Sequence, residues 1–188
     1  MDARLVCWAR AVKARQGGSR LPVLWLFTDP QRLPDPRQAV AALPRGLCGV
    51  VLRHDDAALG RDLARICRAR RNALVVAGNW RLAAALGAGV HLRRGIGPGR
   101  GRLVTSSAHT RVELQRARRA GAALVFLSPI FATASHVGAV GLGVTRWAAL
   151  AMTLARGGDV AALGGIDGLT ARRMPRFCAA VGAIGALA

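Results

Sequence analysis

From Val23 onward, short apolar runs alternate along the chain with longer segments in which apolar residues recur every three or four positions. The short runs have the length of buried strands, and the longer segments have the period of amphipathic helices. We therefore predict strands over residues 23–27, 49–52, 73–76, 89–92, 103–105, 123–127, 160–163 and 183–187.

The segments of helical period lie between these runs. They predict helices over residues 56–70, 80–86, 110–120, 144–155 and 170–178. Strict alternation indicates parallel strands joined by crossovers, and eight such strands favour a (β/α)8 barrel, with a doubly wound open sheet as the alternative. The barrel is minimal, because residues 95–99 leave little room for a fourth helix and no eighth helix follows the last predicted strand.

The first 20 residues differ from the rest of the chain. They form a basic, amphipathic segment that ends in Gln16-Gly17-Gly18-Ser19-Arg20, which indicates an extra helix followed by a flexible joint. We therefore divide the chain into an N-terminal helical extension, residues 1–20, and a barrel domain, residues 21–188. We expect the extra helix to cover the gap left by the missing eighth helix.

Composition limits the class of protein. With 188 residues, of which 52% are hydrophobic, the chain can bury the core of one domain. No apolar run approaches the roughly 18 residues of a membrane span, and basic residues interrupt the N-terminus too often for a secretory signal. We expect a cytoplasmic protein. The four cysteines are scattered with no C-x-x-C pair, which favours reduced, mostly buried thiols.

The net charge of +19 suggests an anionic partner. Nearly all the basic residues are arginines spread along the whole chain, and aromatic residues, on which nucleic-acid bases would stack, make up only 4%. Phosphorylated small molecules are therefore the partners that we favour, and an arginine-rich nucleic-acid binder is an alternative. The sequence leaves the oligomeric state open.

Candidate chemistry lies where the predicted strands end, because barrel enzymes act at the carboxyl ends of their strands. His109, in the cluster SSAHT after the fifth strand, can take up and release a proton near neutrality. A plain helix start explains the same cluster, since Thr110 and Glu113 have the spacing of a capping box. The two interpretations are compatible.

Three glycines and one arginine predict a phosphate site. Gly164 and Gly165 follow the seventh strand and Gly185 lies in the eighth, where exposed backbone amides of such barrels bind phosphate. Alone, a pair of glycines also marks an ordinary turn. Arg53, after the second strand, is a suitable bidentate partner for phosphate.

A second polar cluster, SPIFATASH over residues 128–136, begins a long loop of the kind that often forms a lid. It carries Thr133, Ser135 and His136, although an exposed glycine-rich connector is the alternative. His91, inside an apolar strand, is expected to be a core histidine. Carboxylates are scarce after the third and fourth strands, so the sequence predicts no metal site there.

Taken in order, these clusters resemble the thiamine phosphate synthase and thiazole tautomerase family. The resemblance covers residue 23 to about residue 187. It rests on Phe27-Thr28-Asp29, Arg53, Gly89-Val90-His91-Leu92, SSAHT (106–110), SPIFATASH (128–136) and Leu163-Gly164-Gly165-Ile166.

This resemblance implies a (β/α)8 barrel that acts in thiamine biosynthesis. The synthase joins an aminopyrimidine diphosphate to a thiazole phosphate with Mg²⁺, whereas the tautomerase shifts protons on a thiazole carboxylate phosphate. The resemblance makes His109 the proton shuttle. It assigns substrate binding to Arg53, Ser107, Thr133, Ser135 and His136, and phosphate binding to Gly164, Gly165 and Gly185.

The chain departs from the synthase pattern at several positions. Residues 78–81 and 92–95 lack the aspartates that bind magnesium in the synthase, and His136 replaces its loop lysine. Val51 and Asp55 stand in place of a glutamine and a lysine. We therefore favour a tautomerase-like enzyme with no evident cofactor, and expect Mg²⁺ only if the synthase reaction is retained. A non-catalytic sensor of phosphorylated ligands is a further alternative.

Overall fold

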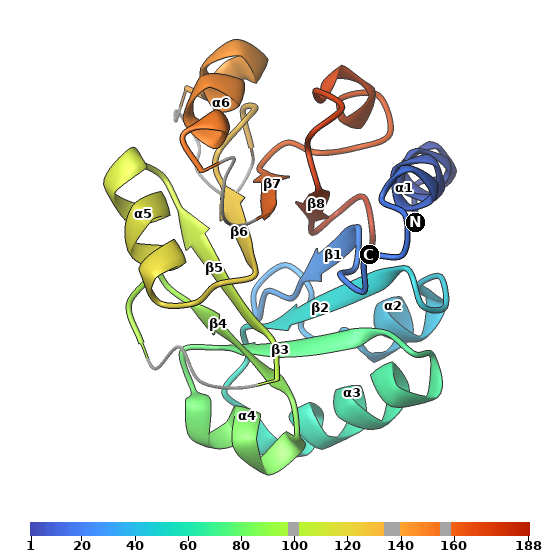
Figure 1. The fold of residues 1–188 in the computed structure, drawn as a ribbon. Helices are drawn as coiled ribbons and strands as arrows, with labels where there is room; N and C mark the ends of the chain where they lie inside the picture. Colours follow the sequence, from blue (N-terminus) through green and yellow to red (C-terminus); the bar gives the residue numbers. More distant parts are fainter. Residues whose placement is uncertain (98–101, 134–139, 155–158) are drawn as a thin grey trace.

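The computed structural model describes residues 1–97, 102–133, 140–154 and 159–188, and it contains a closed barrel of parallel strands (Figure 1). Each strand pairs with the next, and β1 pairs with β8 through Leu24 and Val181, which excludes an open sheet. The predicted (β/α)8 barrel is confirmed. The strands are β1 (Leu24–Phe27), β2 (Cys48–Leu52), β3 (Ala73–Ala77), β4 (Gly89–Leu92), β5 (Val104–Ala108), β6 (Leu124–Leu127), β7 (Asp159–Leu163) and β8 (Ala180–Ala183).

Helices surround the barrel. They are α1 (Ala3–Arg15), α2 (Arg37–Ala42), α3 (Ala57–Ala69), α4 (Trp80–Leu86), α5 (Arg111–Arg119) and α6 (Gly143–Met152), with a short 3-10 turn, η1 (Ala171–Arg173). The sequence did not predict α2. No helix lies among the described residues between β4 and β5.

Two predicted elements are wrong. The last strand ends at Ala183 instead of beginning there, and the residues after it form a turn. The helix predicted over residues 170–178 is reduced to η1, because Pro175 disfavours the helical conformation at the residue before it, and Met174 is extended with ψ of 141°.

Aromatic side chains fill the interior of the barrel. Trp25 and Phe27 point inward from β1 and meet the ring of Phe126 edge-on, with centroids 5.5 and 4.9 Å away. Two neighbouring strands carry glycine where these rings lie. A Cβ atom at Gly49 would come within 2.4 Å of the Trp25 ring, and one at Gly182 within 2.7 Å of the Phe27 ring. The glycines therefore make room for the large rings in a narrow barrel.

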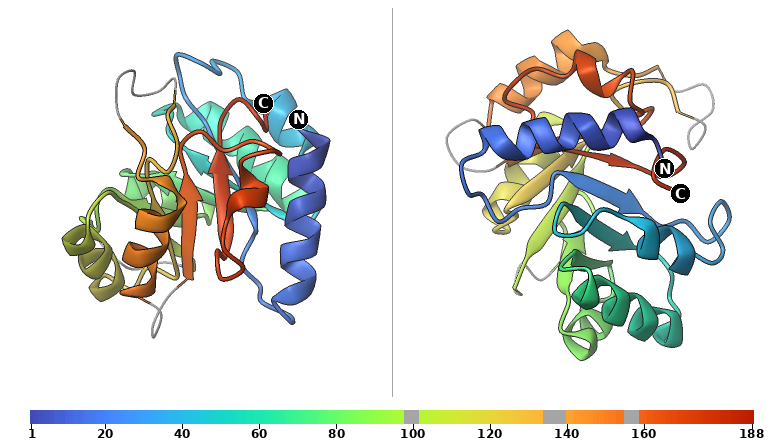
Figure 2. Two further views of the ribbon diagram at one scale, coloured as in Figure 1. Left: turned by 90° about the horizontal axis from the view of Figure 1, so that it is seen from above. Right: turned by 90° about the vertical axis from the view of Figure 1, so that its right-hand side faces the viewer.

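Helix α1 packs against the outside of the barrel on the side of β8 (Figure 2), where it also contacts η1. Leu5, Val6, Ala9 and Val12 form its buried face and join the core between the strands and the helices. At its other end, Gln16 Nε2 donates a hydrogen bond of 2.7 Å to the carbonyl oxygen of residue 179. Helix α1 thus lies where the eighth helix of such a barrel would be.

Three of the four cysteines are buried, and Cys7 is exposed. Burial raises the pKa of Cys48, Cys67 and Cys178 to about 12, so these thiols stay protonated at neutral pH. None of the helices in the described ranges combines the length and apolar character that crossing a bilayer requires.

Candidate functional site

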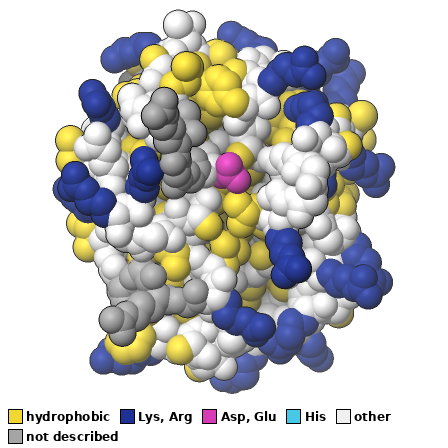
Figure 3. All heavy atoms as spheres, in the orientation of Figure 1, with side chains coloured by type: hydrophobic (Ala, Val, Ile, Leu, Met, Phe, Trp, Pro, Cys, Tyr) yellow, Lys and Arg dark blue, Asp and Glu magenta, His cyan; other side chains and the backbone are white. Residues whose placement is uncertain are grey.

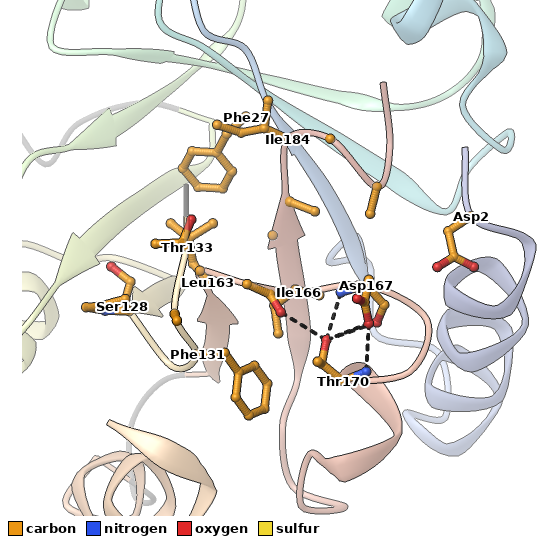
Figure 4. Close-up of a pocket in the computed structure, with 18 of the residues that line it drawn as sticks. Asp2, Phe27, Ser128, Phe131, Thr133, Leu163, Ile166, Asp167, Thr170 and Ile184 are labelled. Carbon is orange, nitrogen blue, oxygen red and sulfur yellow. Dashed lines mark hydrogen bonds between the residues drawn. The ribbon is translucent and has the colours of Figure 1, made fainter. Parts of the chain in front are cut away.

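A cavity of about 780 Å³ opens at the carboxyl ends of β1, β2 and β5–β8 (Figure 4). This volume is sufficient for a small organic ligand. The polar lining comes from the loops after the strands, and Phe27 closes the barrel side. Six of the predicted site residues line the cavity: Arg53, His109, Thr133, Gly164, Gly165 and Gly185.

His109 lies in the cavity wall after β5 and is held by a backbone group of the next loop. Its Nδ1 lies 2.8 Å from the carbonyl oxygen of Ser128, with the Ser128 hydroxyl further away at 3.3 Å. Since a carbonyl oxygen can only accept, Nδ1 carries the hydrogen. In the neutral form of the ring, the lone pair of Nε2 is therefore the group that can accept a proton.

The predicted helix start beside His109 is also present. Thr110 caps α5 by accepting a hydrogen bond of 3.2 Å from the amide of Glu113. The Glu113 carboxylate accepts one of 2.7 Å from the amide of His109, and its other oxygen lies 3.7 Å from Nε of Arg94. The cap therefore fixes the backbone of His109 without using its imidazole.

Gly164 and Gly165 turn the chain at the end of β7. Their φ angles are 97° and 65°, which other residues rarely adopt. A Cβ atom at Gly165 would come within 2.5 Å of the carbonyl oxygen of Ala132. Glycine is required here both for the backbone conformation and for the close approach of the β6 loop.

Gly185 lies across the cavity entrance, in the turn after β8. The nearest atom to a Cβ built at Gly185 is Nη2 of Arg32, 3.9 Å away, so the backbone faces open space. No acceptor among the described residues bonds the amides of Gly165, Ile166, Gly185 and Ala186. Amides of this kind at the ends of β7 and β8 are suitable donors for a phosphate.

Arg53 is fixed through its backbone and its charge. Its amide donates to the Thr28 hydroxyl, 2.9 Å away, and its Nη2 lies 3.4 Å from the Asp29 carboxylate. Burial favours a higher pKa of Asp29, but amide hydrogen bonds from Arg32 and Gln31 and the charge of Arg53 together lower it. Asp29 therefore remains charged and holds the guanidinium at the cavity.

His91 is a core histidine, as predicted. Its Nδ1 lies 2.9 Å from the Thr105 hydroxyl, and its ring packs near Phe27 and Phe126 inside the barrel. Burial, together with the positive charges of Arg53 and Arg93, lowers the pKa of His91 to about 3, so it stays neutral.

The other predicted site residues lie elsewhere. Ser107 is not in the cavity wall, and its hydroxyl accepts a hydrogen bond of 3.3 Å from the amide of Arg94. Ser135 and His136 lie outside the described residues. Sequence reasoning missed Asp2, in the N-terminal extension, and Phe131, which lies within the SPIFATASH motif.

The residues present at the ends of β3 and β4 do not fit a magnesium ion. The oxygen of Asn79 caps α4 by accepting from Leu82, and residues 93 and 94 are arginines. Within the parts of the chain that the structure describes, no three His, Cys, Asp or Glu side chains gather as metal ligands. Hard divalent cations prefer oxygen ligands, carboxylates above all, and none of these three residues supplies a carboxylate.

Figure 3 shows the distribution of basic side chains on one face of the molecule. On the face shown in Figure 3 they are spread around the periphery, with apolar side chains and a single acidic group nearer the centre. Nucleic-acid binding generally uses a continuous basic patch or stripe. This face therefore gives no support for the nucleic-acid alternative.

Solved structures with the same fold include several enzymes. Thiamine phosphate pyrophosphorylase from Pyrococcus furiosus aligns over 86% of this chain and 85% of its own, with 18% identity and a TM-score of 0.68. A native KDPGal structure is 17% identical and aligns over 88% of this chain and 84% of its own, with a TM-score of 0.57. The 2-keto-3-deoxy-6-phospho-gluconate aldolase from Zymomonas mobilis is 14% identical and aligns over 87% of this chain and 82% of its own, with a TM-score of 0.56.

At these identities the structural matches show the barrel fold alone. No curated protein matches the sequence. Residues 24–184, which run from the first to the last strand of the barrel, match the thiamine monophosphate synthase (TMP-TENI) family. The cavity with its histidine and glycines is thus carried by a chain that belongs to the thiamine monophosphate synthase family.

Proposed function

We propose that this protein is a tautomerase-like enzyme that moves a proton on a thiazole phosphate, with His109 as the proton shuttle. The observation that carries this proposal is the hydrogen bond of 2.8 Å between His109 Nδ1 and the Ser128 carbonyl oxygen. It fixes the ring so that Nε2 is the basic nitrogen in a cavity of suitable size.

The proton transfer conserves all atoms of the substrate. Nε2 takes a proton from one position on the substrate, and the imidazolium returns it at another. During this cycle Nδ1 keeps its hydrogen and its bond to Ser128, so the ring need not rotate. The developing positive charge on the ring is also stabilised by that carbonyl oxygen.

The phosphate of the substrate would bind the amides of Gly165 and Gly185. These amides have no acceptor among the described residues, and the glycines let a ligand approach the backbone closely. Arg53 would balance a further negative charge of the substrate, such as a carboxylate, since Asp29 offsets only one side of its guanidinium. Thr133, also in the cavity wall, would contact the ring.

We favour proton transfer over synthesis of thiamine phosphate for a reason of donor chemistry. The synthase reaction expels pyrophosphate and uses Mg²⁺, whereas the ends of β3 and β4 offer an arginine pair and a capping asparagine in place of carboxylates. A proton shift has no diphosphate leaving group. The residues present are therefore suited to the tautomerase reaction.

The purified protein tests this proposal with two substrate mixtures. One contains the thiazole carboxylate phosphate tautomer alone, and the other contains aminopyrimidine diphosphate and thiazole phosphate with Mg²⁺. We expect conversion of the tautomer and no thiamine phosphate. Formation of thiamine phosphate that requires Mg²⁺ would assign the synthase reaction, and binding of both ligands without turnover would assign a sensor.

A further inference from the structure

We infer that Asp2, in the N-terminal helical segment, is a positioning residue that holds the two phosphate-binding loops together. The inference rests on the proposed function, because it concerns the glycine amides at the ends of β7 and β8. Asp2 lies at the start of α1, beside the loop that carries Asp167 and Thr170 (Figure 4).

Asp2 makes one hydrogen bond to each loop. Its Oδ2 accepts from the amide of Gly168, 2.7 Å away, in the loop after β7 that also carries Gly165. Its own amide donates to the carbonyl oxygen of Ala186, 2.8 Å away, in the turn that contains Gly185. A single residue therefore joins the two halves of the phosphate site.

The β7 loop behaves as one unit at the point where Asp2 holds it. The Thr170 hydroxyl accepts from the amide of Asp167 at 2.8 Å and lies 3.0 Å from the carbonyl oxygen of Gly165. The Asp167 carboxylate in turn accepts from the amide of Thr170 at 2.8 Å. A displacement at Gly168 would therefore be transmitted to Gly165.

Asp2 is itself held firmly. Its Oδ1 caps α1 by accepting from the amides of Arg4 and Leu5, at 2.8 and 3.3 Å, and Leu5 is fully buried. The contact with Gly168 leaves no spare space, since a Cβ there would come within 2.5 Å of Cβ of Arg4 and 2.6 Å of Oδ1 of Asp2. The N-terminal helix thus fixes the separation of the two loops.

The charge of Asp2 makes the positioning role separable from an electrostatic one. Asp2 lines the cavity, and its carboxylate repels a phosphate. Removal of that charge alone would tighten anion binding. Removal of a positioning contact would weaken it, because ligand donors must be held to within a fraction of an ångström. The two roles therefore predict opposite changes in phosphate affinity when Asp2 is replaced.

The substitution Asp2→Ser keeps a good helix cap, but the serine side chain is too short to reach the amide of Gly168. Asp56→Ser is the matched control, because Asp56 caps α3 in the same way, by accepting from the amides of Ala58 and Leu59 at 2.7 and 3.1 Å, away from the cavity. Inorganic phosphate is titrated into each full-length protein while the amide resonances of Gly165 and Gly185 are followed. Amide hydrogen exchange is measured in both loops without ligand.

We expect Asp2→Ser to weaken phosphate binding about tenfold, because the glycine amides are no longer held in position for the ligand, and to speed exchange in both loops. Asp56→Ser should match the unaltered protein in both measurements. Equal or tighter phosphate binding by Asp2→Ser would overturn this inference alone. If the unaltered protein does not bind phosphate at these amides, the proposed function fails too, and the inference falls with it.

A second substitution reaches the same contact from the loop. Gly168→Ala leaves Asp2 intact but forces the β7 loop away from α1. We expect it to weaken phosphate binding in the same direction as Asp2→Ser. Unchanged affinity in Gly168→Ala, with the protein folded, would contradict the role of this contact.

Discussion

The hydroxyl oxygen of Thr28 lies 2.9 Å from Nδ1 of His54, inside the barrel mouth where both side chains are buried. The same hydroxyl accepts the amide of Arg53, also at 2.9 Å. One hydroxyl therefore joins the ends of β1 and β2 and fixes the backbone from which the Arg53 side chain reaches the cavity.

Thr28→Val removes this hydroxyl while keeping the volume of the side chain. The Arg53 amide and the His54 ring then lose a buried partner, so we expect the free energy of unfolding to fall by about 1–3 kcal/mol. Thr153→Val is the control, because its hydroxyl bonds Leu150 at an exposed helix end. Chemical denaturation of both variants checks this, and equal stability of Thr28→Val and the unaltered protein would contradict the network.

Three glycine substitutions separate backbone strain, steric clash and ligand access. Gly46→Ala places a side chain at φ of 69° in open space, so it should cost about 1 kcal/mol of stability. Gly165→Ala adds a clash with the carbonyl oxygen of Ala132 and should lower the free energy of unfolding further.

In Gly185→Ala the new Cβ meets no atom closer than 3.9 Å, so the substitution should leave the melting temperature unchanged and weaken phosphate binding. Melting curves and phosphate titrations on all three variants provide the test. Normal phosphate affinity in Gly185→Ala would argue against phosphate binding at the Gly185 amide.

His91 should make stability depend on pH. Burial, with Arg53 and Arg93 nearby, lowers its pKa to about 3, whereas an unfolded histidine titrates near 6.5. Between these values the unfolded chain binds a proton that the folded chain does not. Stability should therefore fall with decreasing pH by about 1.4 kcal/mol per pH unit from this residue.

His91→Gln removes the titrating group and leaves an amide that can bond Thr105. Denaturation of both proteins at several values between about pH 4 and pH 6.5 measures the slope. We expect a shallower slope in the variant. The same slope in both proteins would show that other groups control acid stability.

Turnover should not depend on a divalent cation. The ends of β3 and β4 carry Asn79, Arg93 and Arg94, and the oxygen of Asn79 already caps a helix. Rates of tautomer conversion with excess chelator and with added Mg²⁺ should agree. A rate that rises and saturates with Mg²⁺ would mean that the protein recruits a metal with groups that we have not assigned.

The sequence predicts the barrel well because its strands are distinct apolar runs. The last strand was misplaced since residues 179–188 are mostly small and apolar, with no periodicity to mark where pairing begins. The helix predicted over residues 170–178 did not take Pro175 into account, and this proline ends the helical turn at Arg173. Helix α2 is only six residues long and follows a segment with three prolines, so its signal was weak.

The location of the candidate residues was easier to predict than their contacts. Motif position alone put His109, Arg53 and the glycines at one end of the barrel, where they line one cavity. The partner of His109 is a backbone carbonyl at Ser128, and a backbone carbonyl is available at every residue, so nothing in the sequence marks it. The contact between Asp2 and Gly168 joins residues 166 positions apart and depends on how the helix packs.

The central claim is that His109 transfers the proton, and His109→Gln tests it most directly. Glutamine retains a polar side chain that can contact Ser128, but it cannot act as a base near neutral pH. Ser128→Ala is the control, because it keeps the carbonyl that holds Nδ1. The measurement is the rate of thiazole tautomer conversion at saturating substrate, together with phosphate-ligand affinity.

We predict that His109→Gln loses at least about a hundredfold in rate, as expected for the loss of a general base, while its affinity stays within about twofold. Ser128→Ala should keep most of the rate. Conversion by His109→Gln at the rate of the unaltered protein would contradict the account.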